Sequence, residues 1–419
     1  MNTPKLIAFY LPQFHRNKIN NSLWGPGFTE WTNVAKSRPN FVGHYQPHIP
    51  ADLGFYDLSF SAPLKEQAEM AKEYGIHGFC FYSYWFDGVK PLETPLKNFL
   101  NSDINFNFCL CWANENWTKN WDGGNQEVIF EQKYPSNFSA EYIGSIIEFL
   151  KDYRYITVDG KPFLIIYRPQ KFPDPRRNLQ EMRDAAKALG LKGLYIGVVD
   201  FLLGEETAQS YGADCIIEFP PHQFKLPSIL KSIPDGEGLW NKNYRGYLYD
   251  YKDFIKIATQ KWNDKENIKR IRGVCPSWDN TARRRNDSVI LLNSTPNLYK
   301  DWLTYALLYS KKNKSEFVFI NAWNEWGEGC HLEPDLKYGR KYLEATKEAL
   351  QTFNYSNLQE FNIKLNVKLS AEINKKNDDY IPLSSSAFVP ISYKDFVKSR
   401  LSRYPRIYSI AQYLYNFFK

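Results

Sequence analysis

The feature that most constrains the fold is the regular alternation of short apolar runs, rich in β-branched and aromatic residues, with amphipathic stretches of helical period. The runs that we predict as strands are Leu6–Leu11, His77–Tyr82, Asn107–Trp112, Phe163–Tyr167, Leu194–Val199, Cys215–Phe219, Gly273–Pro276 and Phe317–Ala322. The stretches that we predict as helices are Ala62–Tyr74, Leu92–Leu100, Glu141–Lys151, Arg176–Leu189, Glu205–Tyr211, Tyr251–Trp262, Asn297–Tyr309 and Tyr338–Leu350. Continuous apolar strands alternating with helices are typical of a helix-covered parallel sheet. Eight such units close a (β/α)₈ TIM barrel, which is the α/β fold that we predict.

The alternative topology is a doubly wound open sheet. That fold normally has a Gly-rich phosphate-binding turn after its first strand, whereas Leu11-Pro12-Gln13-Phe14 stands at this position. Two long connections, residues 15–60 and 220–247, are expected to lie over the catalytic face. The alternation breaks near residue 356, so we expect a catalytic barrel over residues 1–355 and a basic, aromatic C-terminal extension over residues 356–419.

Several general features of the chain concern its location and partners. It has no run of 18 apolar residues, and its first residues lack the pattern of a signal peptide, so we predict a cytoplasmic protein. Five of the six cysteines lie in apolar runs, which indicates reduced core thiols. The net charge of +7 is spread along the chain and does not indicate nucleic acid. Residues 391–419 have two open interpretations: peripheral contact with the inner face of the membrane, or a terminal helix packed on the barrel.

Aromatic residues make up 17% of the chain, and many of them stand in stretches rich in Gly, Pro and Asn. Aromatic rings on polar loops favour stacking against a sugar. In a TIM barrel the chemistry collects at the C-terminal ends of the strands. Those ends and the adjoining loops carry aromatic, amide and charged side chains, which predicts a carbohydrate site. The residues predicted to bind substrate are Tyr10, Gln13, Trp31, His44, Tyr82, Tyr84, Trp85, Trp112, Asn114, Glu115, Trp117, Tyr167, Glu218, Trp278, Asp279, Asn280, Arg283, Arg284, Trp323, Asn324 and Trp326.

The sharpest motif is Asn324-Glu325-Trp326-Gly327-Glu328-Gly329, after the eighth predicted strand. Two carboxylates three residues apart on such a turn can face one cavity. Glycoside cleavage needs a carboxylic acid that protonates the leaving oxygen and a second group at the anomeric centre. In the alternative interpretation Asn324 caps a helix and the glutamates complement its dipole. The aromatic surroundings favour catalysis, so Glu325 and Glu328 are the predicted catalytic residues.

Charged and metal-binding motifs were also considered. The run Arg283-Arg284-Arg285 has two open interpretations, an anion site for a diphosphate-linked or acidic glycan and a solvated charge run. His44 and His48 stand four apart, but Pro47 between them argues against a helical zinc pair. The sequence has no His-Glu-x-x-His, P-loop or Gly-x-Ser-x-Gly motif, so we predict neither a metal nor a cofactor. It also has no Asp-x-Asp motif, which argues against a metal-dependent nucleotide-sugar transferase.

Long stretches of the sequence resemble the WbsX-like family. The stretches that carry the resemblance are residues 7–15 (Ile-Ala-Phe-Tyr-Leu-Pro-Gln-Phe-His), residues 27–34 (Gly-Phe-Thr-Glu-Trp-Thr-Asn-Val), residues 43–47 (Gly-His-Tyr-Gln-Pro), residues 111–117 (Cys-Trp-Ala-Asn-Glu-Asn-Trp), residues 278–284 (Trp-Asp-Asn-Thr-Ala-Arg-Arg) and residues 324–329. That family occurs in bacterial surface-polysaccharide (O-antigen type) gene clusters. It is related to glycoside hydrolase family 99, the endo-α-mannosidases, which use a (β/α)₈ barrel and retain the anomeric configuration.

The resemblance implies roles for both glutamates. Glu325 would deprotonate the sugar 2-hydroxyl, giving a 1,2-anhydro intermediate, and Glu328 would be the general acid/base. Ser83-Tyr84-Trp85 is similar to the family 99 second-strand end, whereas the residues 112–117 are not shared with the mannosidases, so mannose is not implied.

We therefore expect a retaining glycoside hydrolase that cleaves an α-glycosidic bond. Its expected substrate is an oligosaccharide or polysaccharide, with an anionic or lipid-diphosphate-linked glycan as one form. Two alternatives stay open: a glycosyltransferase in O-antigen or capsule (lipopolysaccharide-type) biosynthesis, and a non-catalytic glycan-binding barrel.

Overall fold

The structure is a computed structural model of the 419-residue chain. It describes residues 3–118, 128–222, 230–231, 240–260, 262 and 267–370.

A parallel barrel forms the centre of the molecule. Its strands are β1 (Lys5–Tyr10), β2 (Ile76–Ser83), β3 (Asn107–Trp112), β7 (Lys161–Ile166), β8 (Tyr195–Asp200), β9 (Cys215–Glu218), β12 (Arg270–Ile271), β13 (Gly273–Val274) and β16 (Phe317–Ile320). The strand order is β12-β9-β8-β7-β3-β2-β1-β16-β13, and all of these pairs are parallel. Because β12 and β13 are separated by one residue and pair with opposite ends of this order, together they serve as one interrupted strand that nearly closes the barrel. The predicted (β/α)₈ fold is confirmed.

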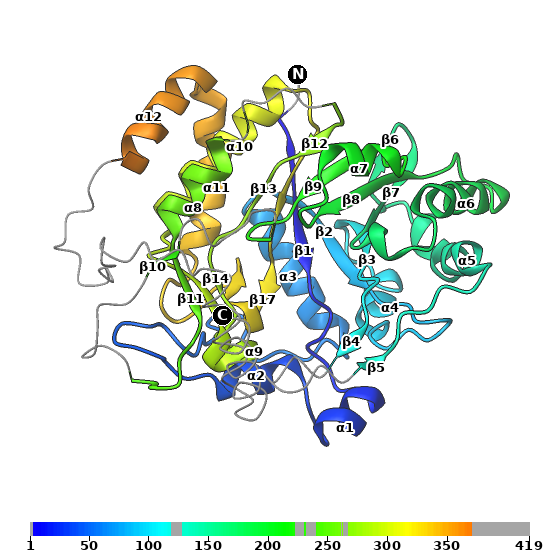
Figure 1. Ribbon diagram of the computed structural model, residues 1–419, viewed down its shortest axis with the longest axis horizontal. Coiled ribbons are helices and arrows are strands. Elements are labelled where there is room, and N and C mark those ends of the chain that lie inside the picture. The colour runs from blue at the N-terminus through cyan, green and yellow to red at the C-terminus, as the bar shows by residue number, and fades with distance from the viewer. Residues whose placement is uncertain are drawn as a thin grey trace, which may run out of the picture.

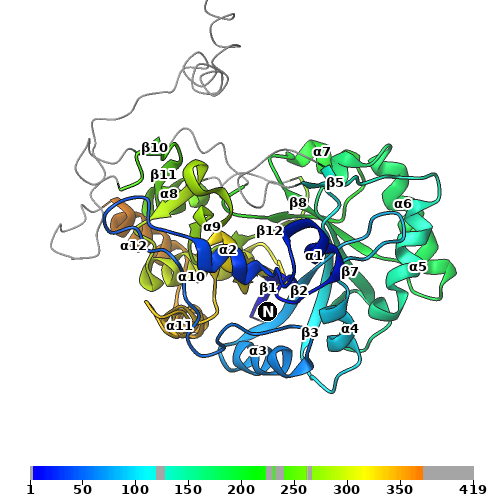
Figure 2. The ribbon, with the colours of Figure 1, turned by 90° about the horizontal axis from the view of Figure 1, so that it is seen from below.

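Helices cover the outer face of the barrel, as Figures 1 and 2 show. They are α3 (Ser61–Glu73), α4 (Thr94–Leu100), α5 (Phe138–Leu150), α6 (Pro175–Ala188), α7 (Glu205–Ser210), α8 (Tyr251–Gln260), α10 (Pro296–Lys312) and α11 (Lys341–Tyr355). The local sequence determines where several of these helices begin. Asp174 and Thr295 cap α6 and α10 through side chains that accept backbone N–H groups, and a proline follows each cap. The barrel strands are mostly apolar in their central residues because both of their faces are covered.

Further elements lie over the C-terminal ends of the strands, at the lower end of Figure 1. They are α1 (Lys18–Trp24), α2 (Glu30–Lys36), β4 (Trp117–Thr118), β5 (Val128–Phe130), α9 (Thr281–Arg284), β17 (Asn324–Glu325) and β18 (Cys330–His331). A second sheet of β10 (Leu230–Lys231), β11 (Tyr247–Asp250), β15 (Val289–Leu292) and β14 (Trp278–Asp279) stands beside the barrel, and β6 (Thr157–Val158) pairs with β7. The long connections therefore contain secondary structure that the hydrophobic pattern did not predict.

The start of the predicted C-terminal extension packs on the barrel. Helix α12 (Leu358–Ser370) buries Leu365 and Leu369 in the main core and contacts α8 and α10. Residues 391–419, for which we considered membrane contact, lie outside the described residues. All six cysteines are buried and unpaired, as predicted. Among the described residues, no helix combines the length and apolar character needed to cross a membrane.

Candidate active site

The two predicted catalytic glutamates lie on a short hairpin above the end of β16. Strand β17 pairs with β18 in antiparallel fashion, with Glu325 opposite Cys330. The Asn324 side chain accepts the N–H of Leu11 at 2.7 Å and donates to its carbonyl at 3.0 Å, which fastens the hairpin to the end of β1. The turn continues as a 3₁₀ helix over Trp326–Glu328, and Gly329 ends it with a φ of +55°. Asn324 thus holds strand β17 in place and does not cap a helix.

A single guanidinium group joins both glutamates to a third carboxylate. Arg283 Nη2 lies 2.8 Å from Glu325 Oε2, and Nη1 lies 2.9 Å from Glu328 Oε1. Arg283 Nε donates to Glu30 Oε1 at 2.7 Å, from the first turn of α2. The Glu30 side chain is fully buried, whereas the side chain of Glu328 is 22% exposed and that of Glu325 is 6% exposed. Three segments far apart in the sequence therefore meet at one cluster.

The glycine between the two glutamates is required by this arrangement. A Cβ atom built on Gly327 would lie 1.9 Å from Glu30 Oε1 and 2.7 Å from Arg283 Nε. Real Cβ atoms do not approach other atoms so closely, so any side chain here would displace the carboxylate or the guanidinium. Gly327 allows the turn to pass directly over the Arg283–Glu30 ion pair.

The cluster contains more negative than positive groups. If all three carboxylates were ionised, they would face one guanidinium in a buried setting. Burial raises the pKa of Glu325 to about 8, although the Arg283 guanidinium lowers it and Glu328 raises it further. Burial also raises the pKa of Glu328, again against the influence of Arg283. Because the two groups interact, the pair titrates as a unit and holds a proton near neutral pH. One carboxylic acid beside one carboxylate is the combination that acid/base catalysis requires.

Three tyrosines face the glutamates from the ends of β2 and β7. Burial raises the pKa of Tyr82, Tyr84 and Tyr167 well above 10, and the charge of Glu325 acts in the same direction on Tyr82 and Tyr84. Their hydroxyl groups are therefore neutral and can donate hydrogen bonds. The Tyr82 and Tyr167 ring centroids lie 6.2 Å apart in an edge-to-face arrangement. These rings and hydroxyls form a wall suited to a sugar ring.

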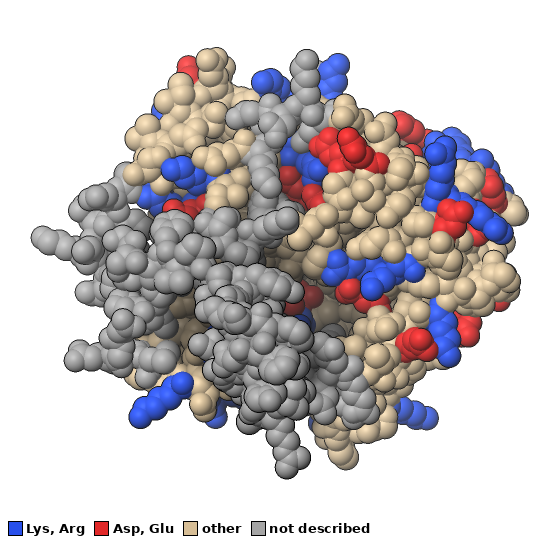
Figure 3. Space-filling model, in the orientation of Figure 1, with Lys and Arg blue, Asp and Glu red and all other residues tan. Residues whose placement is uncertain are grey.

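The rim of the site carries charge of both signs. Arg168 Nε donates to Glu115 Oε1 at 2.6 Å, and the Glu115 side chain is 41% exposed. His222 has its pKa lowered to about 3 by burial and by the positive charges of Arg168 and Arg284. Arg284 itself is exposed. On the face drawn in Figure 3, acidic and basic side chains are interspersed over the described surface.

The arginine run behaves differently at each position. Arg283 engages the three carboxylates described above, so in this structure its partners are protein groups and not a substrate anion. We therefore reassign Arg283 from anion binding to the organisation of the glutamate pair. Arg284 and Arg285 are exposed, and both stay candidates for contact with a charged glycan.

A buried polar network supports the hairpin from behind. Glu333 accepts hydrogen bonds from Trp326 Nε1 at 2.6 Å, Tyr56 Oη at 2.8 Å and Gln67 Nε2 at 2.7 Å. Tyr10 donates to Gln67 Oε1 at 2.6 Å. Burial raises the pKa of Glu333 to about 7, although these donors lower it. Tyr10 and Trp326, both predicted to bind substrate, thus have their polar groups turned toward Glu333 and its neighbour.

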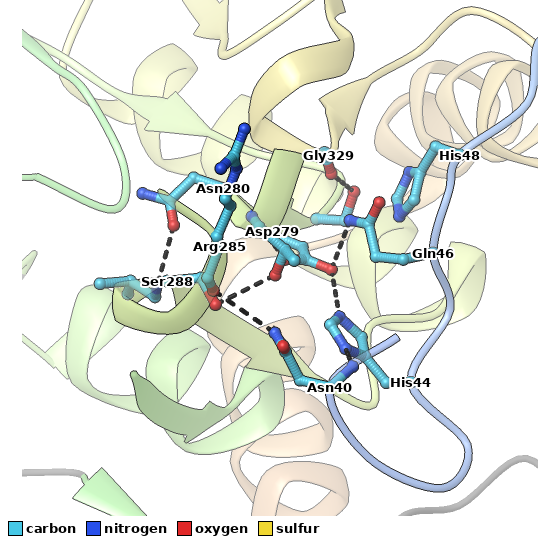
Figure 4. Close-up of polar contacts among 12 residues, drawn as sticks. Asn40, His44, Gln46, His48, Asp279, Asn280, Arg285, Ser288 and Gly329 are labelled. Atoms are coloured by element: carbon cyan, nitrogen blue, oxygen red, sulfur yellow. Dashed lines mark hydrogen bonds and ion pairs between the residues drawn. The ribbon is translucent and has the colours of Figure 1, made fainter. Parts of the chain in front are cut away.

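A second buried network surrounds Asp279, as Figure 4 shows. His44 Nε2 and Gln46 Nε2 each lie 2.7 Å from Asp279 Oδ2, and Thr281 N–H donates to Oδ1 at 3.0 Å. The Asn40 N–H donates to His44 Nδ1 at 2.9 Å, so that nitrogen carries no proton and His44 donates through Nε2. Burial raises the pKa of Asp279, but His44 and these hydrogen bonds lower it to about 2. The hydrogen-bonded pair of His44 and Asp279 fastens the first long loop to β14.

The remaining predicted substrate-binding residues have internal partners or are fully buried. Trp31 donates to the Tyr56 carbonyl, Asn114 bonds with the backbone of Arg168, and Asn280 accepts the Val289 N–H. Glu218 is buried in an ion pair with Arg272 at 2.7 Å. Trp117 packs against Tyr84, with ring centroids 5.5 Å apart. The others with side chains in the interior are Gln13, Trp85, Trp112, Trp278 and Trp323. We assign this group to the support of the site, in which Trp117 lies next to Tyr84 of the tyrosine wall.

Sequence reasoning missed three residues of the site: Glu30, Arg168 and Glu333. Glu30 lies within the stretch of residues 27–34, where a cap threonine followed by glutamate marks a helix start. That signal could have drawn attention to the carboxylate. Arg168 follows Tyr167 at the end of the fourth predicted strand, and that position was a signal for a site residue. Nothing local distinguishes Glu333, because its partners Tyr56 and Gln67 come from distant segments.

The chain is similar in sequence to known proteins. Residues 6–346 match the family described as glycosyltransferase WbsX. Two proteins named "Uncharacterized protein WxcX", from Xanthomonas campestris pv. campestris strains B100 and ATCC 33913, are each 37% identical over 349 residues, which cover 82% of this chain and 49% of the relative. The chain thus spans about half the length of the curated relatives that it matches.

Solved structures are similar in fold. A GH99 endo-α-mannosidase from Bacteroides thetaiotaomicron, in complex with bis-tris-propane, has a TM-score of 0.51 at 14% identity, over 84% of this chain and 97% of that chain. A glycoside hydrolase-like protein has a TM-score of 0.54 at 14% identity, over 84% of this chain and 94% of that chain. At this identity the likeness concerns the fold.

Proposed function

The chain belongs to the WbsX family, and from that premise we propose that it is a retaining glycoside hydrolase that cleaves an α-glycosidic bond in a bacterial surface polysaccharide. The observation that carries the proposal is the buried Glu325–Glu328 pair, which shares one guanidinium and retains a proton at neutral pH. Glycoside cleavage needs such a pair, one group to protonate the leaving oxygen and one to act at the sugar ring.

The two glutamates have different surroundings, and this supports different roles. Glu328 is the more exposed, so its carboxyl group can reach the glycosidic oxygen and act as the general acid/base. Glu325 is deeper, beside Tyr82 and Tyr84, where it would take the proton of the sugar 2-hydroxyl. Among the described residues, the second oxygen of each glutamate has no hydrogen-bond partner, so Oε1 of Glu325 and Oε2 of Glu328 are available to substrate.

Arg283 would orient both groups. Its guanidinium holds one oxygen of each glutamate, and its charge lowers the pKa of both carboxyls below what burial alone would give. Without it, the pKa of both carboxyls would be higher, and the pair would supply a base less readily. The three tyrosine hydroxyls would position the sugar through hydrogen bonds, with Trp117 as an adjacent apolar surface.

A second candidate function is sugar transfer, because the matched family is described as a glycosyltransferase. The two functions differ in what they consume. A hydrolase releases a reducing sugar from glycan in water alone, whereas a transferase of this kind needs an activated donor such as a nucleotide sugar.

The test is turnover of purified surface polysaccharides and synthetic α-linked oligosaccharides, with product analysis by mass spectrometry, in the presence and absence of nucleotide sugars. Products from glycan alone, carrying ¹⁸O from labelled water at the anomeric carbon, support hydrolysis. Products formed only in the presence of a nucleotide sugar would identify a glycosyltransferase instead. Glycan binding that survives the double change Glu325→Gln and Glu328→Gln, with no product under either condition, would identify a binding protein.

A further inference from the structure

A group of side chains of metal-binding type lies at the β17–β18 hairpin, to which His331 belongs. His48, His331 and Asp335 are all buried, and one donor atom from each lies within 4.8 Å of the others. They line a cavity of about 1070 Å³ between the first long loop, the β14–β15 region and the first turns of α10 and α11. The cavity gives an ion and a water molecule access to the three side chains.

Hydrogen bonds fix the protonation of the two imidazoles. His331 Nδ1 lies 2.8 Å from the Glu333 carbonyl oxygen, which can only accept, so Nδ1 carries the proton and Nε2 presents its lone pair. His331 Nε2 lies 2.9 Å from His48 Nδ1, so the His48 nitrogen donates to it. Both rings are therefore neutral. A histidine whose other nitrogen donates to a backbone carbonyl is held as metal-ligating histidines usually are.

Asp335 supplies a carboxylate at the same place. It accepts the Tyr338 N–H at 2.6 Å, and within the described part of the chain it forms no ion pair with Lys or Arg. A buried carboxylate without a cation is costly. A divalent ion bound beside it would remove that cost. Lys337 lines the same cavity with its ammonium 5.1 Å from the centre of the Tyr45 ring, and its repulsion would limit the affinity.

We propose that His48, His331 and Asp335 bind one divalent cation of the zinc type, with a water molecule from the cavity as the fourth ligand. Two imidazole nitrogens and one carboxylate oxygen form a donor set that zinc accepts in tetrahedral geometry. Zinc bonds of about 2.0–2.2 Å place tetrahedral ligand atoms roughly 3.4 Å apart, so the side chains need to move by about 1 Å. The His48 proton would move from Nδ1 to Nε2 or to solvent when that nitrogen binds the ion.

The ion would fasten the catalytic hairpin to the first long loop. His331 lies opposite Asn324 in the β17–β18 pair, and its ring stacks on Trp326 with centroids 3.8 Å apart. His48 belongs to the loop that His44 attaches to Asp279 (Figure 4). The three ligands therefore have a positioning role toward Glu325. This site differs from the helical His44–His48 pair that the sequence argued against, because His44 turns to Asp279.

The test uses the full chain and zinc itself, without glycan, so its outcome is independent of the proposed hydrolysis. Chelator-treated protein is titrated with zinc by calorimetry, and its melting temperature is followed by scanning fluorimetry. Cobalt serves as a spectroscopic probe, because tetrahedral Co²⁺ absorbs strongly in the visible range. The variants are His48→Gln, His331→Gln and Asp335→Asn, and the matched control is His77→Gln, a half-buried histidine at the start of β2.

We expect one zinc ion per chain, a higher melting temperature with zinc, and at least about tenfold weaker binding in each ligand variant. The control is expected to bind as the unchanged protein does. If His331→Gln fails to fold because its ring supports Trp326, the other two variants decide. Failure of the unchanged protein to bind zinc would overturn the site. So would a zinc affinity of His48→Gln and Asp335→Asn equal to that of the unchanged protein.

Discussion

Replacement of Glu325 by glutamine is expected to make the protein more stable while removing its activity. The folded state favours the neutral form of Glu325, because burial raises its pKa from the usual 4.5 to about 8. Glutamine has nearly the same shape and is neutral at every pH. The cluster would then keep one guanidinium for two carboxylates instead of three.

The size of the effect follows from proton affinity. A tenfold change in proton affinity corresponds to about 1.4 kcal/mol, so the shift sets a ceiling of roughly 4–5 kcal/mol. The bond to Arg283 is already included in this shift, because it is among the effects that lower the pKa of Glu325. Since Glu325 and Glu328 titrate together, we assign about half of the shift to Glu325. A net gain of about 2 kcal/mol is therefore expected above pH 8.

The dependence on pH has a definite sign. Since the folded-state pKa of Glu325 lies above the unfolded value, the unchanged protein loses stability as the pH rises from about 4.5 to about 8. The variant lacks this loss. The difference in free energy of unfolding between variant and unchanged protein should therefore be absent near pH 4.5, grow between pH 4.5 and pH 8, and be constant above pH 8. Urea denaturation from pH 5 to pH 9 measures it.

The control for this experiment is Glu115→Gln, which removes a half-exposed carboxylate from an ion pair with Arg168 at the rim. Its effect should stay below about 1 kcal/mol at every pH. Two results would contradict this reasoning: Glu325→Gln less stable than the unchanged protein at pH 8.5, or a difference in free energy of unfolding that does not depend on pH. Either would mean that the cluster does not retain a proton on Glu325.

Three further predictions concern the same face. Glu328→Gln should slow hydrolysis by about 10²–10⁴-fold, and by less for a substrate with an activated leaving group such as nitrophenyl. Glu325→Gln should slow hydrolysis of both substrate types. Folded variants that hydrolyse both substrates as fast as the unchanged protein would contradict these roles. Gly327→Ala should lower both melting temperature and activity because its Cβ meets the ion pair below it, while Gly144→Ala, with open space in α5, should raise stability by about 0.5–1 kcal/mol. Arg284→Gln should weaken binding of a charged glycan more than that of a neutral analogue, with a difference that shrinks at high salt; equal losses would leave Arg284 as a solvated residue.

The sequence predicted the barrel well because each strand carries its own signal. The run Asn107–Trp112 is apolar after its first residue, and the observed β3 has the same bounds. The seventh predicted strand, Gly273–Pro276, was the least accurate: it includes β13 (Gly273–Val274) but misses β12 (Arg270–Ile271), which lies on the other side of Arg272. Arg272 is a buried cation that pairs with Glu218, and a charged residue interrupts an apolar pattern.

The site was less predictable because its function depends on contacts between distant segments. The spacing of Glu325 and Glu328 predicted that they face one cavity. Their link to Glu30 through Arg283 spans about 250 residues of sequence, and no local pattern indicates it. The aromatic content was a misleading signal in part. Trp112, for example, stacks on Tyr142 with centroids 3.9 Å apart in the protein interior, so a tryptophan at a strand end is not necessarily exposed to a ligand.

Two buried carboxylates on neighbouring turns show how the fold separates support from chemistry. Asp279 accepts hydrogen bonds from His44, Gln46 and Thr281, and its pKa falls to about 2 although burial acts to raise it. Glu325 is also buried, yet among the described residues it bonds only with Arg283, and its pKa rises to about 8. Donors alone do not explain the difference, because Glu333 accepts three hydrogen bonds and its pKa still rises to about 7. Neighbouring groups differ as well: His44 lowers the pKa of Asp279, whereas the carboxylates of Glu328 and Glu30 raise that of Glu325. The charged neighbours of a buried carboxylate, together with its donors, therefore distinguish the acid that supports the loop from the acid that we propose to be reactive.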